Sequence, residues 1–226
     1  MLDWRMPVDV EETPSRFARW RTATLAPFEH RAFALFWWAS LASSFGSMIQ
    51  TVGASWLMAT IAPSPDQVAL VQTANTLPFF FLSLLAGALA DTRDRRTIML
   101  VSQVLALLAS VALAVVMLAG RVTPALLLGL TFLIGRGGGA FAPAWQASIG
   151  DQVPRAQIAQ AIMANAAGFN LARSVGPAIG GVIVAAVGAA GALVVNAVSS
   201  LGIIATLVWW RPKRVRAELP PEPLGT

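Results

Sequence analysis

Six apolar stretches, each long enough to cross a lipid bilayer as a helix, occupy most of this sequence. A transmembrane helix needs about 20 mainly apolar residues. The composition agrees, because only 12% of the residues are charged, whereas a soluble domain carries about 25%. We therefore expect an all-α integral membrane protein with six transmembrane helices. The predicted spans are Phe33–Ile61, Val68–Ala90, Thr97–Ala119, Ala125–Ala147, Ala161–Val187 and Ala190–Trp210.

The connections between these spans are short, and Gly188 is the main break before the last one. Short connections are typical of antiparallel neighbouring helices. The pattern predicts a cytoplasmic N-terminal segment at residues 1–32, a six-span domain at 33–210 and a cytoplasmic segment at 211–226. The last segment is basic and then rich in proline, as is typical of the beginning of a linker.

The distribution of Arg and Lys residues predicts the orientation in the membrane, because cytoplasmic loops carry an excess of them. Of the 16 Arg and Lys residues, thirteen lie on one side of the predicted spans and Arg121 alone lies on the other. The remaining two, Arg136 and Arg173, fall inside spans. Both termini are therefore expected in the cytoplasm, with the chain in the inner or plasma membrane of a bacterial cell.

Four tryptophans lie near the expected cytoplasmic ends of the first and last spans: Trp37, Trp38, Trp209 and Trp210. Tryptophan is enriched where a membrane meets water. We expect these side chains to face lipid as an aromatic belt.

Several function classes are excluded by composition. The chain has no cysteine and one histidine, His30, which lies outside the spans. Disulfides, thiolate metal sites, histidine metal clusters and histidine-based catalytic triads are thereby excluded, and we expect no cofactor, no metal and no enzyme activity. The net charge of +5 is spread over short loops, so membrane topology explains it better than nucleic-acid binding.

Polar residues inside the spans suggest where a cavity could lie, because such residues normally face protein or water. At helical spacing, Arg136 and Gln146 share a stripe in the fourth span, and Asn170, Arg173 and Gly180 share one in the fifth. The first and second spans also carry amides, so the first, second, fourth and fifth spans are the better candidates for lining a cavity. The polar residues of the third span lie mostly toward its ends. The candidate cavity residues are Gln50, Gln72, Asn75, Arg136, Gln146, Asn170 and Arg173.

Two interpretations of these residues remain open. Small and polar residues can also serve as contacts between helices, and for the glycines we favour that interpretation. The arginines are different, because an unpaired charge inside a span is costly. No Asp or Glu lies inside a predicted span, so each arginine needs carbonyls, amides, water or an anionic ligand. This reasoning favours an anionic or catechol-like substrate.

Two motifs resemble signatures of one transporter family. Gly87-Ala88-Leu89-Ala90-Asp91, followed by Arg95-Arg96, resembles the cytoplasmic loop 2–3 signature of the major facilitator superfamily. Gly176-Pro177-Ala178-Ile179-Gly180-Gly181 resembles the fifth-span signature of its drug/proton antiporter branch. The stretch from Ala140 to Gln146, with Asn170 to Arg173, is similar to the subgroup that contains the enterobactin exporter. The chain departs from these signatures at Thr92, Asp94 and Ala172 and around Arg136.

The resemblance implies a fold and residue roles. The fold would be the N-terminal six-helix half of a major facilitator transporter, built as a 3+3 inverted repeat. A gating loop would comprise Gly87, Asp91, Asp94, Arg95 and Arg96. A helix-bending and packing motif would comprise Gly176, Pro177, Gly180 and Gly181.

The resemblance also implies a function, namely secondary-active, proton-coupled export of small amphipathic organic molecules such as siderophores or drugs. The expected partners are the lipid bilayer, a small-molecule substrate, a proton and a second six-helix half, either as the missing C-terminal half or as a partner chain. The alternative is a non-transporting membrane subunit or an inert fragment.

Overall fold

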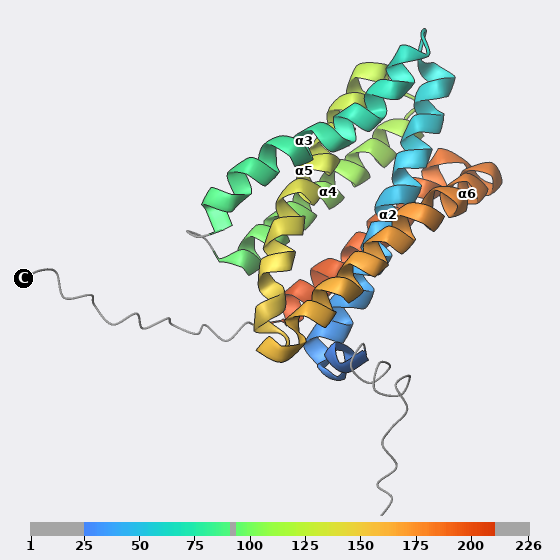
Figure 1. Ribbon diagram of the computed structural model, residues 1–226. Helices are drawn as coiled ribbons and strands as arrows, with labels where there is room; N and C mark the ends of the chain where they lie inside the picture. The colour runs from blue at the N-terminus through green and yellow to red at the C-terminus, as the bar shows by residue number, and fades with distance from the viewer. Residues whose placement is uncertain (1–24, 91–93, 211–226) are drawn as a thin grey trace, which may run out of the picture.

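The regular structure in this computed structural model, which describes residues 25–90 and 94–210, is entirely helical (Figure 1). This confirms the predicted all-α class. The described part contains three short 3-10 helices and five longer α-helices. They are η1 (Ala26–Glu29), α2 (Arg31–Ile61), α3 (Asp66–Ala90), α4 (Arg95–Leu118), α5 (Pro124–Ser148), η2 (Ile149–Asp151), η3 (Arg155–Gln157) and α6 (Ile158–Trp209).

Local sequence explains the helix ends. Thr123 caps α5, since its hydroxyl accepts a hydrogen bond from the Leu126 amide at 3.3 Å, and Pro124 occupies the first turn, where no intrahelical amide donor is required. Gly120 follows α4 with a φ of 66°, a backbone conformation that glycine adopts without steric strain. Pro63 and Pro65 follow α2 and prevent its continuation.

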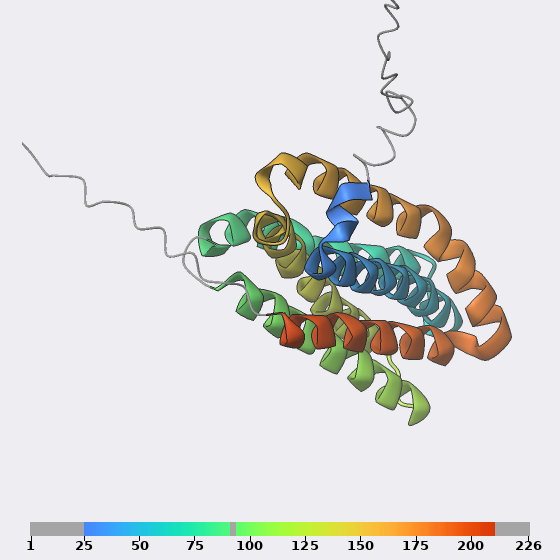
Figure 2. The ribbon, with the colours of Figure 1, turned by 90° about the horizontal axis from the view of Figure 1, so that it is seen from below.

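Gly188 divides α6 into two helical stretches. Its φ of 73° and ψ of −179° are not helical, and the chain reverses direction there (Figure 2). The break lies where the sequence predicts the last connection. With α6 taken as one stretch, four helical stretches of the described chain are long and apolar enough to cross a membrane, namely Arg31–Ile61, Arg95–Leu118, Pro124–Asp151 and Arg155–Trp209. The count of six spans stays a prediction.

The helices pack into one bundle, with α2 lying against α6 and α3, and α5 lying against α3 and α4 (Figure 1). The α4 helix also contacts α6 and so closes the bundle on that side. Two glycines of α5 permit its close contacts. A Cβ atom on Gly135 would come 2.2 Å from the Asn75 carbonyl oxygen, and one on Gly137 would come 2.8 Å from the Ser102 carbonyl oxygen.

The first part of α6, which corresponds to the fifth predicted span, packs closely against α2. The small residues of this part of α6 recur every four positions and are buried: Gly168, Ala172, Gly176 and Gly180. A Cβ on Gly176 would lie 2.7 Å from the Met48 Cβ, and one on Gly180 would lie 3.1 Å from the Ile49 Cα. By contrast, Gly181 is exposed with no atom within 4 Å of such a Cβ, and Pro177 is exposed.

Two expectations about faces are wrong. Gly180 is buried against α2, whereas Asn170 and Arg173 are exposed, so the three residues do not share one environment. Helical periodicity does not decide this, since at about 100° per residue Gly180 lies about 80° from Asn170 but only about 20° from Arg173; the contact with α2 does. Trp37 and Trp210 do not simply face lipid. Trp210 is buried against Phe36, and Trp37 is half-buried, whereas Trp38 and Trp209 are exposed.

Gly176→Ala is expected to lower the free energy of unfolding by about 1–3 kcal/mol, because the added methyl group meets the Met48 Cβ and forces α2 and α6 apart. Denaturant titration in detergent micelles, followed by helical circular dichroism, measures this. The matched control is Gly181→Ala, which meets nothing and should leave stability unchanged or slightly raised. Equal losses in both variants would contradict the close packing.

Candidate functional site

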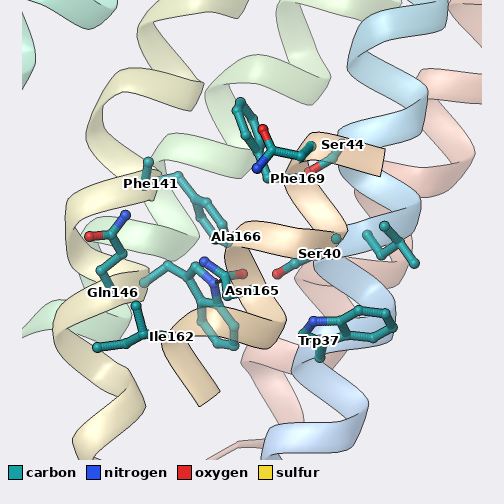
Figure 3. A pocket seen from close by; sticks show the side chains of 14 residues that line it. Trp37, Ser40, Ser44, Phe141, Gln146, Ile162, Asn165, Ala166 and Phe169 are labelled. Atoms are coloured by element: carbon teal, nitrogen blue, oxygen red, sulfur yellow. Dashed lines mark hydrogen bonds between the residues drawn. The ribbon is translucent and has the colours of Figure 1, made fainter. Parts of the chain in front are cut away.

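A cavity of about 330 Å³ lies between α2, α5 and the first part of α6 (Figure 3). This volume is at the lower end of the range for small-molecule pockets. The cavity is lined by aromatic and aliphatic side chains together with amide and hydroxyl groups, and no charged side chain lines it. The lining residues are Trp37, Ser40, Leu41, Ser44, Phe141, Ala142, Trp145, Gln146, Ile162, Asn165, Ala166, Gly168, Phe169 and Asn170.

Helical spacing explains why these side chains meet. Trp37, Ser40 and Ser44 are separated by three and four positions along α2, so they share one face. Asn165 and Phe169 are four apart on α6 and share another.

Two tryptophan side chains attach α6 to its neighbours beside this cavity. The Trp145 Nε1 donates to the Asn165 Oδ1 at 2.8 Å, and the Trp37 Nε1 donates to the Ala164 carbonyl oxygen at 2.9 Å. Trp145 is itself held firmly, because its ring is buried and stacks on Phe36 with centroids 5.1 Å apart. The two bonds reach consecutive residues of α6 from two different helices, so they set the position of Asn165.

The predicted cavity residues divide into three groups. Gln146 and Asn170 line the cavity. Gln72, Arg136 and Arg173 are exposed and do not line it. Gln50 and Asn75 are engaged in contacts between helices. Asn75 is half-buried, and its Nδ2 donates to the Thr51 Oγ1 at 2.9 Å.

Gln50 belongs to a buried polar cluster that joins three helices. Its Oε1 accepts hydrogen bonds from the Ser110 Oγ of α4, at 3.0 Å, and from the Asn196 Nδ2 of α6. The Asn196 Nδ2 also lies 3.1 Å from the Ser110 Oγ. Each of the three side chains thereby finds a partner away from water, which an apolar environment requires.

Sequence reasoning missed Ser110 and Asn196 as partners of Gln50, although depth could have indicated them. Ser110 lies eight residues before the end of α4 at Leu118, Asn196 lies eight residues after Gly188, and Gln50 lies eleven before Ile61. Adjacent antiparallel helices bring residues at similar depths together.

The cavity residues Ser40 and Asn165 were missed too. Both are polar residues within predicted spans, so the rule that selected Gln146 and Asn170 also applied to them.

The described residues include part of the predicted gating loop. Arg96 lies beside the end of α6, where its Nε donates to the Leu207 carbonyl oxygen at 2.8 Å and its Nη2 to that of Val208 at 3.0 Å. Arg95 donates to the Ala147 carbonyl oxygen near the end of α5 at 2.8 Å. Cations are favourable at helix C-termini, where carbonyl groups lack intrahelical partners.

The acidic residues of the loop region have simpler contacts. Asp151 lies 3.5 Å from the Arg95 Nη1, and both side chains are more than 40% exposed, so this pair adds little stability. Asp94 precedes α4, and its Oδ2 accepts a hydrogen bond from the Thr97 hydroxyl at 3.0 Å. Gly87 lies in the last turn of α3, and Asp91 lies outside the described residues.

A comparison with protein families identifies the chain. The major facilitator family described as "Transmembrane secretion effector" matches residues 22–226. The chain belongs to this family. The predicted membership in the major facilitator superfamily is thereby confirmed, and with it an assignment to transporters of the membrane, not to enzymes.

Curated relatives are named as efflux proteins or transporters. The multidrug efflux pump Tap of Mycolicibacterium fortuitum is 31% identical over 156 residues, which are 66% of this chain and 38% of the pump. Tap of Mycobacterium tuberculosis (strain ATCC 25618 / H37Rv) is 31% identical over 158 residues, covering 66% of the chain and 37% of the pump. The staphyloferrin A transporter of Staphylococcus aureus is 27% identical over 141 residues, covering 62% and 36%.

The present chain matches little more than a third of the length of these relatives. The matching parts, of 141 to 158 residues, are somewhat shorter than the predicted six-span domain at residues 33–210. No solved structure matches the chain.

Asn196→Ala is expected to lower the free energy of unfolding by about 1–2 kcal/mol, because Gln50 loses a buried hydrogen-bond donor. Denaturant titration in micelles measures the change. Thr206→Val is a suitable control, since the exposed Thr206 hydroxyl bonds only the Gly202 carbonyl oxygen of its own helix. An Asn196 effect no larger than that of the control would show that the cluster does not hold the helices together.

Proposed function

We propose that this chain forms the N-terminal, six-span half of a secondary-active exporter of small amphipathic organic molecules such as siderophores or drugs. The observation that carries the proposal is the cavity between α2, α5 and α6 in a chain of a transporter family. Its aromatic and apolar walls suit the apolar part of such a molecule, and the amides at Asn165, Gln146 and Asn170 suit its polar groups.

Substrate charge enters the proposal through Arg173. It is exposed on α6 and follows Asn170, a cavity residue, by three positions. Such neighbours lie on the same side of a helix. We assign to Arg173 the attraction of an anionic or catechol-like group at the edge of the cavity, with the rest of the molecule inside.

A second six-helix half completes the proposed transporter. Support comes from the length of the relatives and from large apolar side chains exposed on the first part of α6, such as Phe169, Ile179 and Val182. Exposed apolar surface of this kind meets lipid or protein. Proton coupling forms part of the proposal, and its carrier is assigned to the second half because no Asp or Glu lies inside the predicted spans of this chain.

The proposed orientation places residues 1–32 and 211–226 in the cytoplasm. Green fluorescent protein fused after Thr226 is expected to fluoresce, since it folds in the cytoplasm. Alkaline phosphatase inserted between Gly120 and Arg121 is expected to be active, since it matures outside the inner membrane. The reverse pair of results would contradict the orientation derived from the Arg and Lys distribution.

Transport is tested in proteoliposomes under an imposed pH gradient, with the chain alone and with a second six-helix half. A catechol siderophore and the cationic dye ethidium serve as substrates. Gradient-dependent transport is expected only when both halves are present. Arg173→Ala is expected to slow siderophore transport about ten-fold, the loss typical of one charge-assisted contact, while ethidium transport persists.

The control variant is Arg121→Ala, which changes the connection between α4 and α5 at the end of the bundle away from the cavity. It should leave the transport of both substrates unchanged. Transport by the chain alone would contradict the need for a second half. Unchanged siderophore transport in Arg173→Ala would contradict the role of that charge. No transport of either substrate by both halves together would contradict the exporter.

A further inference from the structure

Asn165 is a polar group of the cavity wall whose orientation another side chain fixes. Its Oδ1 accepts a hydrogen bond from the Trp145 Nε1 at 2.8 Å, and an indole N–H can only donate. Turning the amide over would place its Nδ2 group against that N–H and lose the bond. The Trp145 ring is itself held in place, because it is buried and stacks on Phe36. The bond therefore determines which end of the amide remains for a ligand.

The end that remains is the Nδ2 group of Asn165. It has no hydrogen-bond partner among the described residues, and it is not one of their buried, unpaired side-chain atoms. Asn165 is half-buried and faces the space between α2, α5 and α6 (Figure 3). An amide nitrogen donates hydrogen bonds and does not accept them. The cavity therefore presents a fixed donor at this point.

The other polar side chains of the cavity impose no direction on a hydrogen bond. Gln146 and Asn170 are exposed, and neither holds a side-chain hydrogen bond within the described residues, so their amides can turn to donate or to accept. The Ser44 hydroxyl lines the cavity and rotates in the same way. The Ser40 oxygen is enclosed by protein and lies out of reach of a ligand. A preference of the cavity for acceptors over donors therefore depends on Asn165.

Aromatic rings set the shape of the group that can reach this donor. Trp37, Phe141 and Phe169 line the cavity and provide flat apolar surface, and no charged side chain of the described residues lines it. Flat rings pack well against such surfaces. An uncharged ring system with an acceptor on its edge, such as a carbonyl oxygen, matches both the walls and the donor.

We propose that the cavity selects an uncharged, flat-ringed part of the transported molecule that presents a hydrogen-bond acceptor, and rejects the same shape when it presents a donor. Asn165 makes the contact, and Trp145 is a positioning residue that produces this preference through Asn165. The proposal rests on the proposed function and adds the chemical group that the cavity recognises. A ligand N–H opposite the Nδ2 group would leave both groups unpaired, and such mismatches discriminate strongly.

The test measures equilibrium binding of three flat probes of similar shape to the chain in lipid nanodiscs, with binding to empty nanodiscs subtracted. At the same edge position, 9-fluorenone carries a carbonyl acceptor, carbazole carries an N–H donor, and fluorene carries neither. The unaltered chain is expected to bind 9-fluorenone about ten-fold more tightly than carbazole, a difference typical of one hydrogen bond.

Trp145→Phe tests the positioning role, because it keeps an aromatic ring beside Phe36 but removes the N–H. The Asn165 amide can then turn and accept from carbazole as well as donate to 9-fluorenone. The preference should fall below about two-fold, while the binding of fluorene stays unchanged. The matched control is Trp37→Phe, which also removes an indole bond to α6 but one that ends on the Ala164 carbonyl oxygen. This control should keep the ten-fold preference.

Asn165→Leu tests the donor itself, because leucine has a similar size and no polar group. This variant should bind all three probes about equally. No saturable binding of 9-fluorenone, an absent or reversed preference in the unaltered chain, or a preference that survives Asn165→Leu would overturn the subsite.

The role of Trp145 has its own contrary results. A preference that survives Trp145→Phe, or that Trp37→Phe loses to the same extent, would overturn the positioning role. Equal weakening of all three probes in Trp145→Phe would show a merely structural role and would overturn it too.

The transport assay distinguishes these failures from failure of the proposed function. Transport without any preference for acceptors contradicts only the subsite. A preference that Trp145→Phe and Asn165→Leu both lose, with no transport of any substrate, supports the subsite and contradicts the exporter.

Discussion

Close contact between α2 and the first part of α6 is the constraint on which the described structure depends. Lipid is as apolar as the helices, so van der Waals contact, and not the hydrophobic effect, has to hold them together. Small residues at four-residue intervals, from Gly168 to Gly180, bring the two backbones close enough for that contact. The same approach brings Trp37 and Ser40 of α2 beside the cavity face of α6.

Polar contacts then fix the bundle at two places along its length without using a buried carboxylate. At one, Gln50, Ser110 and Asn196 satisfy one another across three helices. At the other, Arg96 occupies unpaired carbonyl groups at the end of α6, and the Trp145 indole holds Asn165. The cavity lies beside the second set, so Asn165 in its wall is held by a neighbour that is itself buried. That arrangement suits selective binding, because little order remains to be imposed when a ligand enters.

Part of the candidate site was predictable from sequence. Gln146 and Asn170 line the cavity, as the rule for intramembrane polar residues predicts. The same rule selected Gln50, which instead pairs with Ser110 and Asn196, because a buried amide can be satisfied by protein as well as by a ligand. It also selected Arg136 and Arg173, which are exposed. Polarity identifies a residue that needs a partner, but it does not tell which partner is near.

The sequence by itself determined the helical class, the approximate helix ends and the break at Gly188, since length, hydropathy and turn residues act within a short segment of chain. Tertiary structure alone decided which faces meet: that Gly180 is buried, that Trp210 packs on Phe36, and that Ser40 and Asn165 share a cavity. These outcomes depend on contacts between helices far apart in sequence, and helical periodicity describes one helix at a time.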